Sequence, residues 1–449
     1  MGEHALAAII LAAGQGSRMK SDLHKVLHPI AGKPMLLHLL DQVAVLGAAQ
    51  TVVVAGVRRE QVETAVAGRN VTIAVQEEQL GTGHAVLQAK AALADFSGDV
   101  LILYGDVPMV SAATMRALVE RLHAADSPRA VVLGFRPDDA AAYGRIIADD
   151  AGAICKMVEF KDAGEAERAV TLCNSGLMAV RSADLFDLLE RIGNDNAAGE
   201  YYLPDIVMLP GATSAVITTK AWQVAGINSR AELASVEAAW QQRRRAEAMR
   251  DGATLIAPAT VWFAHDTVLG RDVVIEPNVV FGPGVTIADD VIIHAFSHLE
   301  GATIASGCSV GPFARLRPGA QMQAGSKVGN FVEMKKAVLG PGAKASHLSY
   351  LGDATIGANA NIGAGTITCN YDGYFKYQTV IGEGAFIGSN SSLIAPVKIG
   401  RDAIVAAGSA VSRDVADGEL RLVRGEQLVK PGWADRFHDA MRRKKAERK

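Results

Sequence analysis

Two groups of residues in this sequence have types and spacings that could perform chemistry. The first begins at a glycine-rich loop, residues 12–19, which is followed by Lys25. Loops of this kind bring backbone N–H groups close to phosphate oxygens. Glycines after a strand also fit an ordinary turn, so Arg18 and Lys25 matter here, because phosphates need cations as well as amides. We expect a phosphate-binding loop.

Asp106 belongs to the same group, because it follows the apolar run 100–104 with only Gly105 between them. A carboxylate at the end of a buried strand is well placed to be a hard oxygen ligand for Mg²⁺, which nucleotide phosphates usually require. A helix cap or turn aspartate is the alternative. The sequence therefore favours a nucleotide site near Asp106 without excluding a structural role for this residue.

The second group is a set of polar residues in the last third of the chain: Arg315, Arg317, Glu333, Lys335, Lys336, His347, Tyr350 and Asn361. Histidine is the side chain best suited to remove a proton near neutral pH. The cations beside it suggest an anionic substrate. A single histidine would more often be an ordinary surface or packed residue, so the prediction rests on the whole group.

Alternating strands and helices position the first group. Strands are expected at 5–11, 51–55, 71–75, 100–104 and 130–135, with helices at 35–46, 60–67, 84–93 and 112–124. This alternation predicts an α/β, mostly parallel sheet that is covered on both faces. Ligands of such sheets bind beyond the carboxyl ends of the strands, where Gln76, Gly81 and Asp106 would lie.

A six-residue period positions the second group. Aliphatic, Met or Phe side chains recur at every sixth position in three runs: Leu269, Ile275, Phe281, Ile287, Ile293, Leu299; Ile304, Val310, Leu316, Met322, Val328, Met334; and Ile381, Ile387, Leu393, Ile399, Val405, Val411. This is the hexapeptide β-helix pattern, whose coils must stack to bury their apolar faces. About eight coils at ~4.8 Å each are expected. A β-sandwich with fortuitous spacing is the alternative.

Two segments interrupt this period. One is 339–351, where the sixth position falls on Ala345, and the other is 370–379, with a turn expected at Asp372-Gly373. Insertions into regular repeats tend to carry function.

The flanking segments have simpler interpretations. Residues 229–250 predict one long helix that ends near Gly252, with the run 243–245 as a solvated basic helix end rather than a polynucleotide site. The expected division is therefore 1–228, a linker helix at 229–251, and 252–449. The basic tail, 433–449, is expected to be a flexible, solvated terminus.

Composition limits the function classes. A net charge of −3 and a pI near 6.4 argue against nucleic acid or an anionic membrane as the main partner. The four cysteines, Cys155, Cys173, Cys308 and Cys369, have neither metal nor disulfide spacing, so a cytoplasmic location is expected. The apolar run 5–13 is too short to span a membrane.

Several motifs resemble a known family. Residues 11–19, the Lys25 segment, 79–85, 104–108 and 226–228 are similar to the sugar-phosphate nucleotidylyltransferases. Residues 315–319, 330–336, 347–353 and 361–366 are similar to hexapeptide acetyltransferases. Together they resemble the bacterial bifunctional N-acetylglucosamine-1-phosphate uridylyltransferases and glucosamine-1-phosphate N-acetyltransferases. Ser17 departs from the usual threonine but keeps the hydroxyl.

For the first half, the resemblance implies a uridylyltransferase domain. The uridine nucleotide would be held by Leu11, Ala12, Ala13, Gly14, Gln76, Gly81 and Thr82, and the sugar by Gly144, Glu159 and Asn174. Lys25 would contact phosphate, Asp106 and Asn228 would share Mg²⁺, and Arg18, Tyr104 and Gly105 complete the substrate-binding set. The co-substrates are UTP and N-acetylglucosamine-1-phosphate.

For the second half, the resemblance implies a left-handed parallel β-helix that forms a homotrimer and acetylates glucosamine-1-phosphate with acetyl-CoA. His347 would be the general base. Arg317, Lys335, Tyr350, Asn361 and Lys376 would hold the sugar phosphate, and Ala364, Asn370, Tyr371, Ser389, Ala407 and Arg424 would line the acetyl-CoA site. The alternative is a single nucleotidyltransferase whose β-helix only mediates oligomerisation or allosteric binding.

Overall fold

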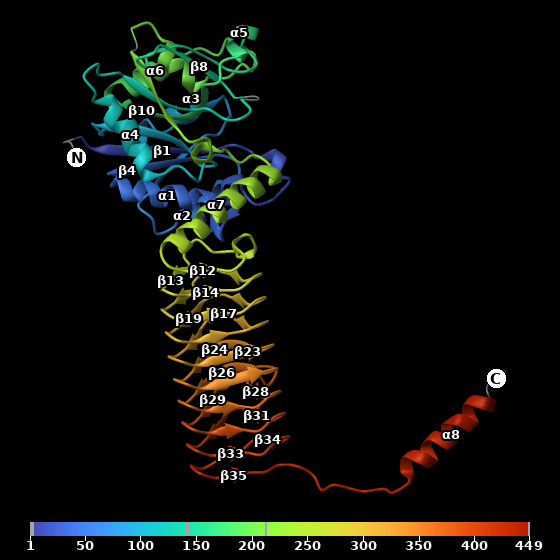
Figure 1. Cartoon of the computed structure of the whole chain (residues 1–449). Helices are drawn as coiled ribbons and strands as arrows, with labels where there is room; N and C mark the ends of the chain where they lie inside the picture. Colours follow the sequence, from blue (N-terminus) through green and yellow to red (C-terminus); the bar gives the residue numbers. More distant parts are fainter. Residues whose placement is uncertain (1–3, 141–142, 212, 448–449) are drawn as a thin grey trace. The chain divides into compact units, whose positions relative to one another are not determined.

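The computed structural model describes residues 4–140, 143–211 and 213–447, and the chain divides into two compact units, Met1–Ala246 and Glu247–Lys449 (Figure 1). No helix among the described residues is long and apolar enough to cross a membrane.

The first unit is built on a nine-stranded sheet with the order β11-β7-β10-β6-β1-β4-β5, to which β8 and β9 are added at β10. β1 pairs in parallel with β4 and β6, whereas β10 is antiparallel to β6 and β7. The prediction of a mostly parallel sheet is confirmed. The strands are β1 (Leu6–Ala12), β4 (Gln50–Ala55), β5 (Thr72–Val75), β6 (Asp99–Tyr104), β7 (Ala130–Phe135), β8 (Arg145–Ala148), β9 (Ile154–Val158), β10 (Cys173–Arg181) and β11 (Ser214–Thr219).

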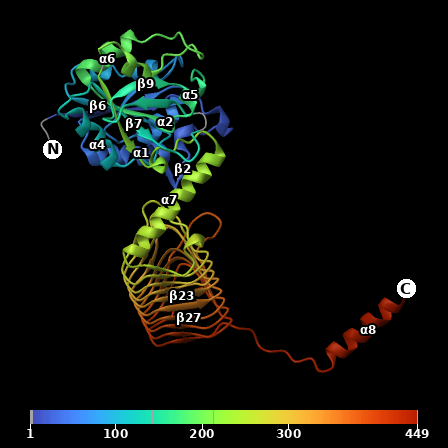
Figure 2. The same cartoon turned by 45° about the horizontal axis from the view of Figure 1, so that its top comes forward.

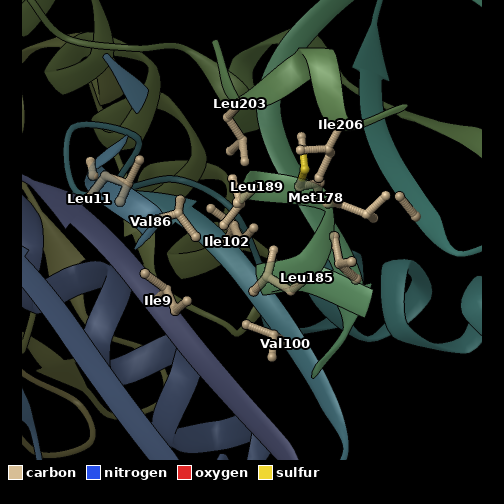
Figure 3. Packing of buried hydrophobic residues seen from close by; sticks show 14 of the residues in the cluster. Ile9, Leu11, Val86, Val100, Ile102, Met178, Leu185, Leu189, Leu203 and Ile206 are labelled. Carbon is tan, nitrogen blue, oxygen red and sulfur yellow. The ribbon is translucent and has the colours of Figure 1, made fainter. Parts of the chain in front are cut away.

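Helices cover both faces of this sheet, which explains why its strands are almost continuously apolar. Side chains alternate between the faces: Ile9 of β1 belongs to one buried cluster, and its neighbour Ile10 belongs to the other. Figure 3 shows the first cluster, in which Ile9 and Ile102 pack with Val86 and Leu185. The helices are α1 (Met35–Leu46), α2 (Arg59–Val66), α3 (Thr82–Leu87), α4 (Ala112–Leu122), α5 (Glu165–Arg168) and α6 (Ser182–Arg191).

The long helix α7 (Arg230–Arg250) begins within the first unit. Its Val236 is buried with Ile30 and Ile227, and the Glu237 carboxylate accepts a hydrogen bond from the Ala31 N–H at 2.7 Å. Arg243, from the basic run expected to be solvated, is exposed but lies over the Trp222 ring at 3.6 Å. The first part of α7 is therefore an integral element of this unit, and the chain divides inside the helix.

The second unit is a stack of short parallel strands (Figures 1 and 2). The six-residue period is confirmed as three strands per coil, because in most coils an inward residue pairs with one 17 or 18 positions further on, as in Ile275 with Ile293 and Ile293 with Val310. Ala345 keeps this register between Val328 and Ile362. The expected interruption at Ala345 was therefore wrong, because alanine shortens the inward side chain without shifting the strand.

Ten strands form one face of the coil, and fourteen form a second sheet. The first face contains β12 (Thr254–Leu255), β14 (Val274–Ile275), β17 (Ile292–Ile293), β20 (Ser309–Val310), β23 (Lys327–Asn330), β25 (Lys344–His347), β27 (Asn361–Ile362), β30 (Phe386–Ile387), β33 (Ile404–Val405) and β35 (Leu420–Arg421). The second contains β13 (Val268–Leu269), β15 (Val280–Phe281), β16 (Thr286–Ile287), β18 (His298–Leu299), β19 (Ala302–Ile304), β21 (Arg315–Leu316), β22 (Ala320–Met322), β24 (Glu333–Leu339), β26 (Tyr350–Ile356), β28 (Ile367–Cys369), β29 (Thr379–Ile381), β31 (Ser392–Ile394), β32 (Val397–Ile399) and β34 (Ala410–Val411).

One coil is longer than the others, as the second interruption predicts. Ile356 pairs with Ile381, 25 positions on, and the extra residues leave the coil between β28 and β29. The expected turn is present, because Asp372 Oδ1 accepts hydrogen bonds from the N–H groups of Tyr374 and Phe375 at 2.8 and 2.7 Å. Beyond the last coil, where a flexible terminus was expected, the chain forms helix α8 (Trp433–Glu447), none of whose residues is buried.

Candidate active sites

A cavity of about 440 Å³ lies at the carboxyl ends of β1 and β6. It brings together most of the predicted nucleotide and metal residues, and Asn174 of the predicted sugar residues: Leu11, Ala12, Ala13, Gly14, Lys25, Gln76, Gly81, Thr82, Tyr104, Asp106, Asn174 and Asn228. Arg18 and Gly105 are not among its lining residues; Arg18 is exposed, and the Gly105 N–H donates to the Leu11 carbonyl at 2.9 Å.

The glycine-rich loop and Lys25 fit together through Gly16. This residue has a φ of +63°, which favours glycine, and a Cβ there would lie 2.7 Å from Lys25 Cβ. Around Gly14, by contrast, a Cβ would meet no atom within 4 Å. The loop therefore packs on the lysine stem at Gly16 and leaves space at Gly14.

Lys25, Asp106 and Asn228 meet at one point in the cavity. Lys25 Nζ lies 2.5 Å from Asp106 Oδ2 and 3.0 Å from Asn228 Oδ1. The backbone fixes this arrangement, because the Ile227 N–H donates to the Asp106 carbonyl at 3.1 Å and the Asn228 N–H donates to Glu232 Oε2, in the first turn of α7, at 2.6 Å. Carboxylate and amide oxygens converging in this way fit Mg²⁺, which usually takes one or two protein ligands together with substrate phosphates.

The segment before α3 forms another wall of the cavity. Gly81 has a φ of +110°, and a Cβ there would meet the Tyr201 carbonyl oxygen at 2.6 Å. Thr82 Oγ1 accepts a hydrogen bond from the Leu203 N–H at 3.0 Å, and buried Gln76 donates to the Gly81 carbonyl at 3.2 Å. These contacts hold the predicted nucleotide residues rigidly against the segment that contains Tyr201.

The predicted sugar residues line a second cavity of about 270 Å³. Gly144 and Glu159 lie there, and Asn174 lines both cavities, so the two spaces adjoin at this residue. Burial, together with the nearby carboxylates Asp205 and Asp162, raises the pKa of Glu159. The oxygens of this carboxyl group are suited to accept hydrogen bonds from sugar hydroxyls.

In the second unit, His347 ends β25 and is exposed. Its Nδ1 lies 2.5 Å from Oδ1 of Asn330, which occupies the matching position on β23. Because an amide oxygen only accepts, this contact places the proton on Nδ1 and leaves the lone pair on Nε2. An oriented imidazole with a free acceptor nitrogen is the arrangement a general base requires.

The predicted acetyl-CoA residues Ala364, Ser389 and Ala407 lie in successive coils beyond His347. The Gly365 N–H donates to the His347 carbonyl at 3.3 Å, the Asn390 N–H to the Ala364 carbonyl at 2.7 Å, and the Gly408 N–H to the Ser389 carbonyl at 2.8 Å. Arg424 Cδ lies 3.7 Å from where a Cβ on Gly408 would be. The structure therefore aligns these residues along one corner of the coil.

Three of the predicted phosphate-binding cations lie close to one another. The neighbouring cations Lys376 and, more weakly, Arg317 lower the pKa of Lys335. Glu333 partly balances them by pairing with Arg317 at 2.8 Å, and Tyr350 occupies the next coil in register with Glu333. Crowded cations that disfavour one another's charge suit an incoming phosphate.

The remaining predicted residues occupy different positions. Asn361 lies in β27, in register with Lys344. Asn370 is buried, and its amide donates to Asp353 Oδ2 at 2.5 Å. Tyr371 is exposed in the long coil and forms a bridge with Lys376.

Three residues with contacts at these sites have no role predicted from the sequence: Asn330, Asp353 and Glu232. The spacing of 17 residues between Asn330 and His347, one coil apart, was the available signal. A similar 17-residue spacing links Asp353 to Asn370. Glu232 could have been recognised only as an acidic residue in the first turn of the helix after Asn228.

Comparison with known proteins agrees with this arrangement. The MobA-like NTP transferase domain model matches residues 8–251, and the bacterial transferase hexapeptide (six repeats) model matches 266–301 and 378–413. Fold and sites thus define a transferase with two catalytic domains, a nucleotidyltransferase and a left-handed β-helix of hexapeptide repeats.

Full-length relatives make the assignment specific. The chain is 72% identical over 448 residues to the bifunctional protein GlmU of Novosphingobium aromaticivorans, with 99% of each chain covered. It is 69% identical over 444 residues to that of Sphingopyxis alaskensis (98% of each) and 57% over 443 residues to that of Zymomonas mobilis (98% of each). The chain belongs to the bifunctional GlmU family, and is an enzyme that combines uridylyltransferase and acetyltransferase activities.

Proposed function

We propose that this chain makes UDP-N-acetylglucosamine in two consecutive steps. The β-helix transfers the acetyl group of acetyl-CoA to the amine of glucosamine-1-phosphate, and the first unit then transfers uridylyl from UTP to N-acetylglucosamine-1-phosphate. The supporting observation is that one chain carries two separate constellations, Lys25 with Asp106 and Asn228, and Asn330 with His347. Full-length identity to bifunctional relatives does not favour a β-helix that serves only for assembly.

In the acetyl transfer, the sugar amine attacks the thioester carbon and coenzyme A leaves as the thiol. His347 Nε2 takes the proton from the amine and passes it to the leaving thiolate, while Asn330 accepts the hydrogen bond from Nδ1 and stabilises the imidazolium in between. Arg317, Lys335 and Lys376 hold the sugar phosphate, and the corner with Ala364, Ser389 and Ala407 receives acetyl-CoA. A base of this kind typically contributes about 10²- to 10⁴-fold.

In the uridylyl transfer, a phosphate oxygen of the sugar phosphate attacks the α-phosphorus of UTP and pyrophosphate leaves. The chain's own contribution is positioning and neutralisation of charge. Lys25 binds phosphate oxygens, the glycine-rich loop presents its N–H groups, and the residues of the second cavity orient the sugar. Asp106 and Asn228 would hold Mg²⁺, which when bound supplies positive charge at the phosphates.

The assembly is proposed to be a homotrimer, with functional domains at 1–228 and 252–449 joined by the helix at 229–251. Phe296, Phe313 and Phe331 support it, because they stack in successive coils with ring centroids 5.0 and 5.1 Å apart while remaining exposed. An exposed aromatic column of this kind is typical of a surface that another subunit covers. A cytoplasmic location is proposed from the four free cysteines.

A coupled assay tests the two-step proposal. Purified protein is mixed with glucosamine-1-phosphate, acetyl-CoA, UTP and Mg²⁺, and free thiol and pyrophosphate are followed together. We expect both products, with pyrophosphate release dependent on acetyl-CoA. Pyrophosphate formed only from the pre-acetylated sugar phosphate, without thiol release, would reduce the β-helix to a scaffold.

A further inference from the structure

Lys25 has a contact that its proposed role at the phosphates does not explain. Its ammonium group donates to Asp106 Oδ2 and Asn228 Oδ1, the same two oxygens that are proposed to hold the metal ion. The Lys25 and Asp106 side chains are only 13% and 14% exposed, so water screens this ion pair weakly. The ammonium therefore lies at the place where a cation shared by these two oxygens would be.

Two cations do not share this position. Mg²⁺ binds oxygen at about 2.0–2.1 Å, so an ion bound to Asp106 and Asn228 would be in contact with an ammonium bound to the same atoms. At such short distances, repulsion between like charges in a partly buried site costs several kcal/mol. Either the lysine or the metal ion can hold the two oxygens, and metal binding requires the lysine to turn away.

The lysine has a place to turn to. Its stem already packs against Gly16, in the loop proposed to bind phosphates. The four-carbon stem is flexible, so the ammonium can move several ångströms without backbone change. Nucleotide phosphates in the cavity would therefore attract the ammonium away from Asp106 and free both oxygens.

We propose that Lys25 is an internal counter-cation that keeps free divalent metal out of the site until nucleotide phosphates draw it away. This inference rests on the proposed roles of Asp106 and Asn228. It makes metal and nucleotide binding mutually favourable, and by linkage each strengthens the other by the same factor.

The test measures Mn²⁺ binding to the full chain by electron paramagnetic resonance of the free ion, with and without UDP-N-acetylglucosamine. Without the nucleotide sugar, Lys25→Met should bind Mn²⁺ about tenfold more tightly than the wild type. The reason is that the ammonium group, which is hydrogen-bonded to Asp106 and Asn228, no longer competes with the ion for their oxygens, and one such charged hydrogen bond corresponds to about a tenfold change in affinity. The factor by which UDP-N-acetylglucosamine strengthens Mn²⁺ binding should fall by about the same tenfold. Lys25→Arg keeps the charge and should bind Mn²⁺ no more tightly than the wild type.

The outcomes are distinct. Unchanged or weaker Mn²⁺ binding by a Lys25→Met protein that shows wild-type thermal unfolding overturns the inference. A tenfold gain in Mn²⁺ affinity that is the same with and without UDP-N-acetylglucosamine also overturns the inference. That result would mean that the Lys25 ammonium of the wild type stays beside the metal site in both states. Asp106→Asn should bind no Mn²⁺; if it still does, the metal ligands of the proposed function are wrong, whatever Lys25 does.

Discussion

Replacing Asn330 by alanine keeps the base His347 but removes the hydrogen bond that orients it. The variant should therefore show how much this orientation contributes to the rate of acetyl transfer. Asn330 Oδ1 lies 2.5 Å from His347 Nδ1, and the wild-type imidazole becomes charged as it takes the proton. A hydrogen bond to a charged group contributes about 1.5–3 kcal/mol. His347 is exposed, so water replaces part of this stabilisation, and the lower value applies.

The expected result for Asn330→Ala is therefore a loss of about tenfold in kcat, against about 10²- to 10⁴-fold for His347→Ala. KM for glucosamine-1-phosphate should not change, because Arg317 and Lys335 are untouched. The assay is thiol release with saturating acetyl-CoA. Gln321→Ala, an exposed position on β22, is the matched control.

A conservative variant makes this test stricter. Asn330→Asp restores an acceptor at Nδ1 and should recover most of the lost rate. The reasoning is refuted if Asn330→Ala raises KM while kcat stays at the wild-type value, or if it loses as much activity as His347→Ala. The first result would make Asn330 a substrate contact, and the second would make it essential to the fold of the site.

Three further predictions concern other parts of the chain. Asp106→Asn should abolish pyrophosphate release and leave thiol release near the wild-type rate, because the sites lie in separate units; loss of both activities would contradict this independence. Gly329→Ala should destabilise the β-helix by about 1–3 kcal/mol in denaturant titrations, because the added Cβ would lie 1.9 Å from the Ser346 carbonyl oxygen, whereas Gly425→Ala, with open space around it, should be neutral. Burial lowers the pKa of His28, so below pH 6.5 the unfolded chain takes up a proton that the folded chain binds more weakly. The free energy of unfolding of the first unit should therefore fall as pH drops below about 6.5, by at most about 1.4 kcal/mol per pH unit for this residue, and His28→Gln should flatten that slope.

The sequence predicted the fold well wherever a pattern repeats. Helix α1 has the predicted bounds, and the inward positions of the β-helix follow the six-residue period, because side-chain direction is set by the strand. The pattern failed at Ala345, where a change of side-chain size was mistaken for a change of register. The antiparallel direction of β10 was not predicted, since an apolar run does not show in which direction a strand pairs with its neighbours.

The sites were less accessible to sequence reasoning. Strand ends could be located, so Asp106 was expected at the edge of the sheet. Asn228 lies beside it through contacts between distant segments, among them the backbone hydrogen bond from Ile227 to Asp106. The role of Asn228 therefore came only from family resemblance, and the lysine contact that joins the two residues had no signal in the sequence.

The long coil has a consequence for protein engineering. Inward residues such as Ile356 and Ile381 pair although they are 25 positions apart in the sequence. Pairing between successive coils therefore does not require a fixed number of residues per coil. The corner after Cys369 is thus an insertion point, where extra residues leave the coil while the stacked strands keep their pairing. An inserted segment would have to keep Asn370, Tyr371 and Lys376, the loop residues proposed to contact the substrates, for acetyl transfer to continue.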